Sequence, residues 1–153
     1  MIRVLIVEDS AVVTDFLIYI LTSDPEIEVV GTVSDGESAI YAVRKLKPDI
    51  ITMDINLPKM DGFEATRQIM EEQPTPIIIV SGSIDPKETQ NIFKALEAGA
   101  LAIISRPTGI GHPTHEITKK ELIQMINSCY ATENSEKALM SCNSEKAIFK
   151  AFI

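Results

Sequence analysis

The chain has 153 residues, enough for one domain and a short extension, and its 45% hydrophobic and 24% charged residues are typical of a packed globular protein. Its formal net charge of -8 argues against a nucleic-acid surface, because binding to phosphate backbones depends on clustered Lys and Arg. No apolar run approaches the roughly 20 residues that span a bilayer. The N-terminal apolar stretch runs into Glu8 and Asp9 without a cleavage site, and Cys129 and Cys142 show no metal-ligand spacing. We therefore expect a cytoplasmic protein with reduced thiols and no membrane contact.

Short β-branched runs alternate with amphipathic segments over the first 128 residues, and this alternation is typical of βαβ units on a parallel sheet. A strand is predicted over residues 2–7, followed by a helix whose apolar residues recur at helical spacing from 12 to 21. The next strand covers 27–33, and Ser34 with Glu37 forms a capping box that opens a second helix. Residues 50–54 form a third strand whose apolar character suits a central position, and a helix follows over about 63–72.

The second half of the chain continues the same alternation. Residues 77–80 are predicted as the fourth strand, and Asp85 with Pro86 opens a fourth helix that Gly99 ends in the left-handed conformation. Residues 101–105 form the fifth strand, and Thr118 with Glu121 caps a fifth helix. Right-handed crossovers then predict an α/β fold, with a doubly wound five-stranded parallel sheet and helices on both faces.

The last 25 residues differ in character from the first 128, which we take as one domain. They contain a short repeat, Asn134–Ala138 and again Asn143–Ala147, and each copy is followed by apolar residues. Two copies are too few for a solenoid. We therefore predict that residues 129–153 are a C-terminal extension, either a marginal helix or a linker, and the alternative is a docking helix for a partner or a dimer mate.

Acidic side chains follow two of the predicted strands at the point where each strand ends. Glu8 and Asp9 come directly after the first strand, and Asp54 closes the third. Because ligands bind at the carboxyl edge of an open α/β sheet, we expect these carboxylates to converge there. Converging carboxylates repel one another and raise each other's pKa unless a cation neutralises them, and a site of few carboxylates suits Mg²⁺.

These acidic groups also have explanations that involve no function. The Glu8–Asp9 pair can be a solvated turn before a helix, where acidic residues are favourable on their own. Asp54 is harder to explain in this way, because a carboxylate directly after a buried apolar strand is costly unless something uses it.

Four blocks in order resemble those of a two-component response-regulator receiver domain, over residues 1 to about 128. They are Val4–Ser10, Met53–Gly62, Val80–Gly82 and Ser105–Pro107. Residues 70–77, 80–81 and 95–100 are similar to the receiver half of chemotaxis methylesterases. The resemblance implies a flavodoxin-like receiver fold and a part in chemotaxis signalling. Those proteins continue into an esterase domain, whereas this sequence has no Gly-x-Ser-x-Gly nucleophile turn, so we expect a module that stands alone or was cut from a longer protein.

The resemblance assigns chemical roles to the residues at the strand ends. Asp54 would be the phosphoacceptor, whose carboxylate attacks the phosphorus of a phosphohistidine or a small phosphodonor. Glu8 and Asp9 would position Mg²⁺, directly or through water. Asp54 and the backbone carbonyl of Asn56 would complete the protein ligands of the ion.

The residues after the fourth and fifth strands also receive roles. The Ser81 hydroxyl would donate a hydrogen bond to the phosphorylated aspartate, and Gly82 would leave space in the phosphoryl pocket for donor and water. Arg106 stands where the family usually has lysine, and arginine keeps the charge while forking onto two phosphate oxygens. Ile103 stands where many receivers carry an aromatic ring that turns inward on activation, so output would travel by other rearrangements.

The resemblance implies a signalling switch rather than an enzyme, with at most self-catalysed phosphoryl transfer and autodephosphorylation. Its partners would be a sensor histidine kinase or phosphotransfer protein and an unknown output protein, with dimer formation left open. Two alternatives remain. One is a pseudo-receiver that binds partners independently of phosphorylation, as Arg106 and Ile103 suggest. The other is a haloacid-dehalogenase-type phosphatase, which Asn56 and the order of the acidic residues disfavour.

The loop after the fifth strand carries two histidines, His112 and His115. A metal site would need further ligands nearby, and Glu116 is the only obvious one. We therefore expect both histidines to lie in a solvated loop.

Overall fold

A computed structural model describes the chain over residues 1–82 and 89–139, without the side chains of residues 89 and 135–139. In this part of the chain, five parallel strands form one sheet in the order β2-β1-β3-β4-β5. The strands are β1 (Ile2–Val7), β2 (Ile27–Val33), β3 (Ile50–Met53), β4 (Ile77–Ser81) and β5 (Ala102–Ser105). The helices are α1 (Ala11–Thr22), α2 (Gly36–Leu46), α3 (Gly62–Glu72), α4 (Thr89–Ala98) and α5 (His115–Leu139).

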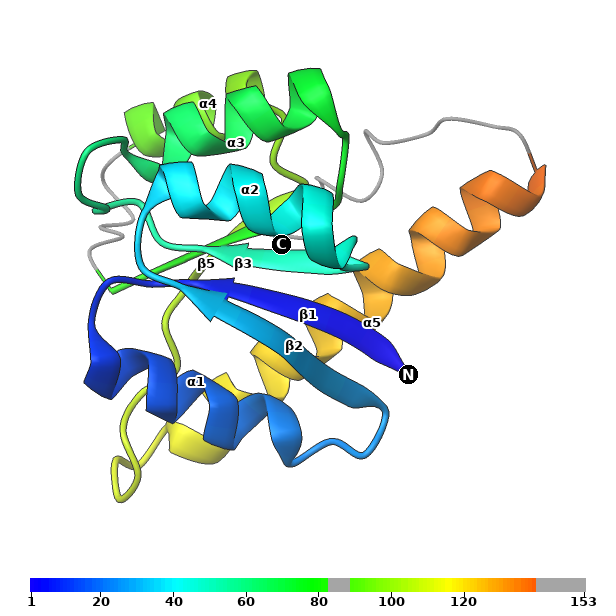
Figure 1. Cartoon of the computed structure of the whole chain (residues 1–153). Helices are drawn as coiled ribbons and strands as arrows, with labels where there is room; N and C mark the ends of the chain where they lie inside the picture. The colour runs from blue at the N-terminus through cyan, green and yellow to red at the C-terminus, as the bar shows by residue number, and fades with distance from the viewer. Residues whose placement is uncertain (83–88, 140–153) are drawn as a thin grey trace.

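The helices form two layers around the sheet. Helices α1 and α5 cover one face, and α2, α3 and α4 cover the other (Figure 1). The predicted doubly wound five-stranded parallel sheet is therefore confirmed.

The strand sequences explain why both faces need a layer of helices. Side chains along a strand point alternately to the two faces, and each set of β1 residues joins a different core cluster. Val4 and Ile6 pack with the residues of α1 and α5. Leu5 and Val7 pack with those of α2, α3 and α4. A strand with both faces apolar is stable only when it is covered on both sides.

Short polar side chains start the first three helices. Ser10 caps α1, Asp35 caps α2 and Asp61 caps α3, each accepting a hydrogen bond from a backbone N–H three residues later. The prediction of Ser34 as the cap of the second helix is wrong by one residue. Asp35 and Ser38 have the same three-residue spacing as Ser34 and Glu37, and the Asp35 carboxylate accepts from the Ser38 N–H at 2.8 Å.

Helix α5 begins earlier than predicted and extends beyond residue 128. It starts at His115, so the proposed cap Thr118 lies within its first turn, where the hydroxyl donates to the Thr114 carbonyl and accepts from the Thr108 N–H. The helix then runs without interruption to Leu139 and projects from the body of the domain (Figure 1). Although α5 has 25 residues, none of the helices in the two described ranges is long and apolar enough to cross a membrane.

Two further details of the predicted helices differ in outcome. Gly99 has a φ of +102° directly after α4, which confirms the left-handed end, whereas the Asp85–Pro86 start lies outside the described residues. Val12, the first of the apolar residues that recur at helical spacing in the first predicted helix, is 79% exposed and does not join the core.

Gly62 lets the start of α3 approach the end of β3. Its N–H donates to the Ile55 carbonyl at 2.8 Å, and a Cβ atom at residue 62 would lie 2.0 Å from the Asp54 carbonyl oxygen. No side chain fits at that distance, so the glycine fixes where the loop after Asp54 turns into α3.

We predict that Gly62→Ala lowers the free energy of unfolding by about 2–3 kcal/mol, because the backbone around Asp54 has to move to accept the methyl group. Urea denaturation measures the difference. Gly109→Ala is the matched control, since a Cβ there meets nothing within 4 Å, and its effect should stay within about 0.5 kcal/mol. Equal effects of the two substitutions would contradict this role of Gly62.

Candidate functional site

The pairing of β1 with β3 brings two carboxylates together. Val7 is the register partner of Met53, so the next residue of each strand, Glu8 and Asp54, emerges at the same edge of the sheet. The Asp54 N–H donates to the Val7 carbonyl at 3.0 Å and continues the ladder by one step. Both carboxyl side chains belong to buried residues, with 4% exposure for Glu8 and 5% for Asp54.

Asp9 joins these two groups from the exposed side. One carboxylate oxygen from each of Glu8, Asp9 and Asp54 lies within 4.8 Å of the others. The structure therefore brings together the three side chains that the sequence suggested would converge. Asn56 lies two residues after Asp54, exposed in the loop before α3, and the part of its backbone carbonyl as a ligand stays a prediction.

The electrostatics of Glu8 reflect this crowding. Burial, the charge of Asp54 and a side-chain hydrogen bond with it raise the pKa of Glu8, which lies at about 7 instead of its usual 4.5. The Ser10 N–H, which donates to Glu8 Oε1 at 3.2 Å, and the nearby Arg106 guanidinium act against the rise. Glu8 is thus a carboxyl group for which the surrounding protein provides too little positive charge.

A hard divalent cation fits this arrangement. Its charge offsets the repulsion that raises the pKa of Glu8, and carboxylate oxygens are the ligands that Mg²⁺ prefers. With one of the three residues exposed, the cluster is open to solvent on one side, which leaves room for water and phosphate oxygens.

The residues after β4 and β5 complete the same edge of the sheet. Ser81 is 1% exposed at the end of β4, and its carbonyl accepts from the Arg106 N–H at 3.1 Å. The Arg106 side chain extends to the acidic cluster, where Nη2 lies 3.9 Å from Glu8 Oε2. Its guanidinium passes so close to Gly82 that a Cβ there would lie 2.8 Å from Nη1. The Arg106 Nε is buried and has no hydrogen-bond partner among the residues that the structure describes.

Ser10 is a site residue that the sequence analysis did not single out. Its hydroxyl accepts from the Val13 N–H at 3.4 Å to cap α1, and its own N–H donates to Glu8. The cap therefore holds the Glu8 carboxylate as well as the helix. The signal was present as a serine two residues after Glu8, directly before the apolar residues of the first helix.

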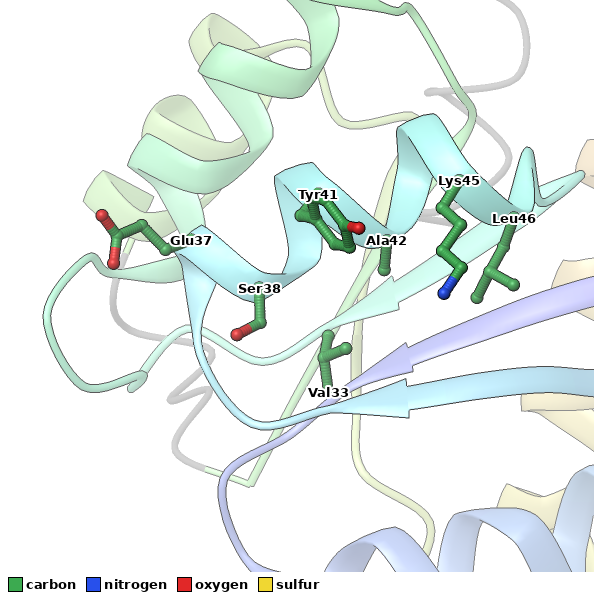
Figure 2. A pocket seen from close by; sticks show the side chains of 7 residues that line it. All are labelled: Val33, Glu37, Ser38, Tyr41, Ala42, Lys45 and Leu46. Atoms are coloured by element: carbon green, nitrogen blue, oxygen red, sulfur yellow. The ribbon is translucent and has the colours of Figure 1, made fainter.

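A groove lies between α2 and β2, and its lining residue Val33 accepts a backbone hydrogen bond from the Glu8 N–H at 3.0 Å. The groove has a volume of about 490 Å³ and shares no residue with the acidic cluster. Figure 2 shows Val33 on β2 facing α2, whose Ser38, Ala42 and Leu46 side chains point toward the strand. Polar side chains line the groove beside the apolar ones, namely Glu37, Ser38, Tyr41 and Lys45, but none of them belongs to the acidic cluster. We therefore place the chemistry at the sheet edge.

The expectation that both histidines lie in a solvated loop is half wrong. His112 is exposed, but His115 is only 6% exposed at the start of α5. Its Nδ1 lies 2.6 Å from the Thr108 carbonyl, and its ring packs against Phe16 with centroids 6.0 Å apart. His115 thus anchors α5 against α1.

Comparison with known proteins identifies the family. Residues 4–127 match the response regulator receiver domain. The chain belongs to this family. The chain is 60% identical over 126 residues to a protein-glutamate methylesterase/protein-glutamine glutaminase of Nitrosospira multiformis. The matched region covers 82% of this chain and 36% of that protein. A protein of the same name from Syntrophus aciditrophicus is 54% identical over 128 residues, or 84% of this chain and 36% of that protein.

Two solved receiver structures are also similar. The response regulator domain of Thermotoga maritima CheB is 37% identical with a TM-score of 0.76, over 86% of this chain and 97% of that one. A chain of the CheX-CheY-BeF3-Mg+2 complex from Borrelia burgdorferi is 29% identical with a TM-score of 0.70, over 84% of this chain and 89% of that one. The resemblance to the receiver half of chemotaxis methylesterases is thereby confirmed.

The relatives correct one expectation. We expected a signalling switch rather than an enzyme, whereas these receiver sequences belong to proteins named as enzymes. The chain spans about a third of the length of the curated relatives it matches, as the 36% coverage shows. The expectation was drawn from the receiver blocks alone, and these blocks lie within the 36% of each relative that this chain matches.

The raised pKa of Glu8 predicts a pH-dependent gain in stability for Glu8→Gln when divalent ions are removed with EDTA. Between about pH 4.5 and pH 7 the folded protein keeps the Glu8 proton that the unfolded chain releases, so the contribution of Glu8 to stability falls as pH rises through that window. At pH 8 the variant should unfold with a free energy about 2–3 kcal/mol higher than the parent, and near pH 4.5 the difference should vanish.

Urea denaturation at several pH values tests this expectation. Glu28→Gln, at an exposed position on β2, is the matched control and should change little at either pH. A Glu8→Gln protein that gains nothing at pH 8 would show that the buried carboxyl group is not destabilising.

Proposed function

We propose that the chain is a phosphorylation-dependent switch in which Asp54 accepts a phosphoryl group from a histidine kinase or a phosphotransfer protein. The observation that carries the proposal is the convergence of Glu8, Asp9 and Asp54 within 4.8 Å at the end of the sheet, in a chain of the receiver family. Two of these carboxyl groups are buried, and burial of a carboxylate is energetically unfavourable unless a bound cation or a partner compensates for it.

Mg²⁺ would be held by the side chains of Glu8, Asp9 and Asp54 and by the backbone carbonyl of Asn56. The Borrelia relative, crystallised with BeF3 and Mg, supports this assignment by its similarity. The bound ion supplies charge neutralisation for the oxygens of the transferring phosphoryl group. Two hydrogen bonds would fix the direction of the accepting carboxylate. The Asp54 N–H donates to the Val7 carbonyl of β1, and the Ile55 N–H donates to Asp54 Oδ1 at 2.9 Å.

The transfer is a displacement at phosphorus. An Asp54 carboxylate oxygen forms the new O–P bond while the bond from phosphorus to the donor breaks, and the donor nitrogen or oxygen keeps the bonding electron pair. Arg106 brings a guanidinium from the end of β5 toward the same place, and its donors suit the phosphoryl oxygens. The Ser81 hydroxyl, at the end of β4, would donate a hydrogen bond to the phosphorylated aspartate.

Phosphorylation would act by shifting the balance between two conformations of the domain. Ile103 is 5% exposed within the core cluster shared with α2, α3 and α4, so output would depend on rearrangements other than the turning of an aromatic ring. By similarity to its relatives, the output we propose is control of a protein-glutamate methylesterase activity in the cytoplasm. Neither the family match nor these relatives support a pseudo-receiver or a phosphatase.

We also propose that the receiver domain ends near residue 128 and that residues 129–153 are an extension of it. The family match, which ends at residue 127, supports this boundary. Helix α5 runs through it to Leu139, so the first part of the extension would be helical.

Asp54→Asn is expected to abolish labelling by radioactive acetyl phosphate in the presence of Mg²⁺, because the amide is a far poorer nucleophile than the carboxylate. The label on the parent protein should be released by hydroxylamine, as expected of an acyl phosphate. Asp15→Asn, at an exposed position on α1, removes the same charge and should leave labelling intact. Undiminished labelling of the Asp54 variant would refute the proposal.

Asp9→Asn is expected to weaken Mg²⁺ binding by about tenfold or more, because it removes a negative ligand while leaving the buried pair in place. Isothermal titration calorimetry with Mg²⁺ measures the change directly, and Asp15→Asn again serves as the control. Unchanged affinity would mean that the ion binds elsewhere or without Asp9.

A further inference from the structure

The backbone conformation at residue 82 does not require glycine. The φ of Gly82 is not among the positive values of the described residues, and the residue is exposed at the end of β4. An alanine is therefore compatible with the chain conformation at this position. What conflicts with a methyl group is the Arg106 side chain, because a Cβ at residue 82 would lie 2.8 Å from Nη1, 3.0 Å from Cζ and 3.3 Å from Nη2.

All three of these atoms belong to one guanidinium group. The group starts from the end of β5, crosses the end of the neighbouring strand β4 at Gly82, and reaches Glu8 at the end of β1. The pairing of Ser81 with Ser105 and the hydrogen bond from the Arg106 N–H to the Ser81 carbonyl fix the point from which the side chain sets out. The space above Gly82 is thus the path by which the guanidinium reaches the acidic cluster.

The Arg106 side chain is held with part of its hydrogen-bonding capacity unused. It is 29% exposed, and Nη2 is 3.9 Å from Glu8 Oε2. The buried Nε has no hydrogen-bond partner within residues 1–82 and 89–139. A buried donor without an acceptor is unfavourable. A group with several acceptor oxygens near the acidic cluster would improve this arrangement, and a phosphoryl group is of that kind.

We propose that Gly82 is a positioning residue for Arg106: it leaves the space in which the guanidinium lies beside Glu8, so that glycine at 82 and arginine at 106 work as a pair in phosphoryl transfer. The part that concerns transfer rests on the proposed function of Asp54. A methyl group at residue 82 displaces the guanidinium, which is the mobile end of a flexible side chain, rather than the backbone. Lysine at 106 ends in a compact ammonium and does not present a planar group to residue 82.

The first experiment tests the position of Arg106 without any phosphodonor or metal. The NMR signal of the Arg106 Nε–H, assigned by its loss in R106K, reports whether this donor is buried. We expect the signal to shift and to lose protection from solvent exchange in Gly82→Ala, and to stay unchanged in Gly109→Ala, where a Cβ has open space. An unchanged Arg106 signal in Gly82→Ala overturns the proposal.

The second experiment is a double-mutant cycle on the rate of Mg²⁺-dependent labelling by acetyl phosphate. Gly82→Ala should slow labelling by about tenfold when residue 106 is arginine and by less than about twofold when residue 106 is lysine, since contacting residues couple on this scale. Equal effects in both backgrounds overturn the pairing. A Gly82→Ala protein that fails to fold and is not rescued by R106K also overturns it.

The two experiments separate this inference from the proposed function. If the parent protein takes no label, the function of Asp54 as phosphoacceptor fails, and the NMR comparison alone decides whether Gly82 positions Arg106. If the parent takes label and the cycle shows no coupling, the proposed function stands and the pairing fails.

Discussion

The repulsion between Glu8 and Asp54 is the constraint on which the rest of the site depends. Parallel pairing of β1 with β3 places both carboxylates at the end of the sheet, with burial that leaves each less than a tenth exposed. The pKa of Glu8 rises to about 7 as a result. A fold that keeps such a pair needs positive charge from somewhere, and near neutral pH a proton, a metal ion or Arg106 can supply it.

These sources of charge compete for the same small space. Arg106 is close enough to lower the pKa of Glu8 but not close enough to neutralise the cluster, since the nearest atoms are 3.9 Å apart. A dication neutralises more, and a phosphoryl group would then provide acceptors for the guanidinium. The backbone holds the carboxylates together without enough positive charge to balance them, and phosphorylation at the proposed Asp54 would give the Arg106 donors acceptor oxygens. The register of β1 and β3 thus creates the excess negative charge on which the proposed switch depends.

Sequence alone predicted the features that follow from topology. Strands that end in acidic residues had to bring Glu8 and Asp54 to one edge once the sheet was parallel, and the blocks around them identified the family. It did not predict that Glu8 would be buried and Asp9 exposed, because both follow the same strand and the difference arises from which way each points. Nor did it predict that the Arg106 guanidinium would lie over Gly82, since that contact depends on side-chain reach across a neighbouring strand. Ser34 failed as a cap because Asp35, an equivalent polar residue, stands next to it. Thr118 failed because α5 already begins at His115.

The carbon-detected NMR titration of the Glu8 carboxyl group, with and without Mg²⁺, tests the central claim most directly. The structure predicts a midpoint near pH 7 in the absence of divalent ions and a clear fall in that midpoint when Mg²⁺ is added, because the cation favours the ionised form. A midpoint in the ordinary range of glutamate that does not respond to Mg²⁺ would contradict the account.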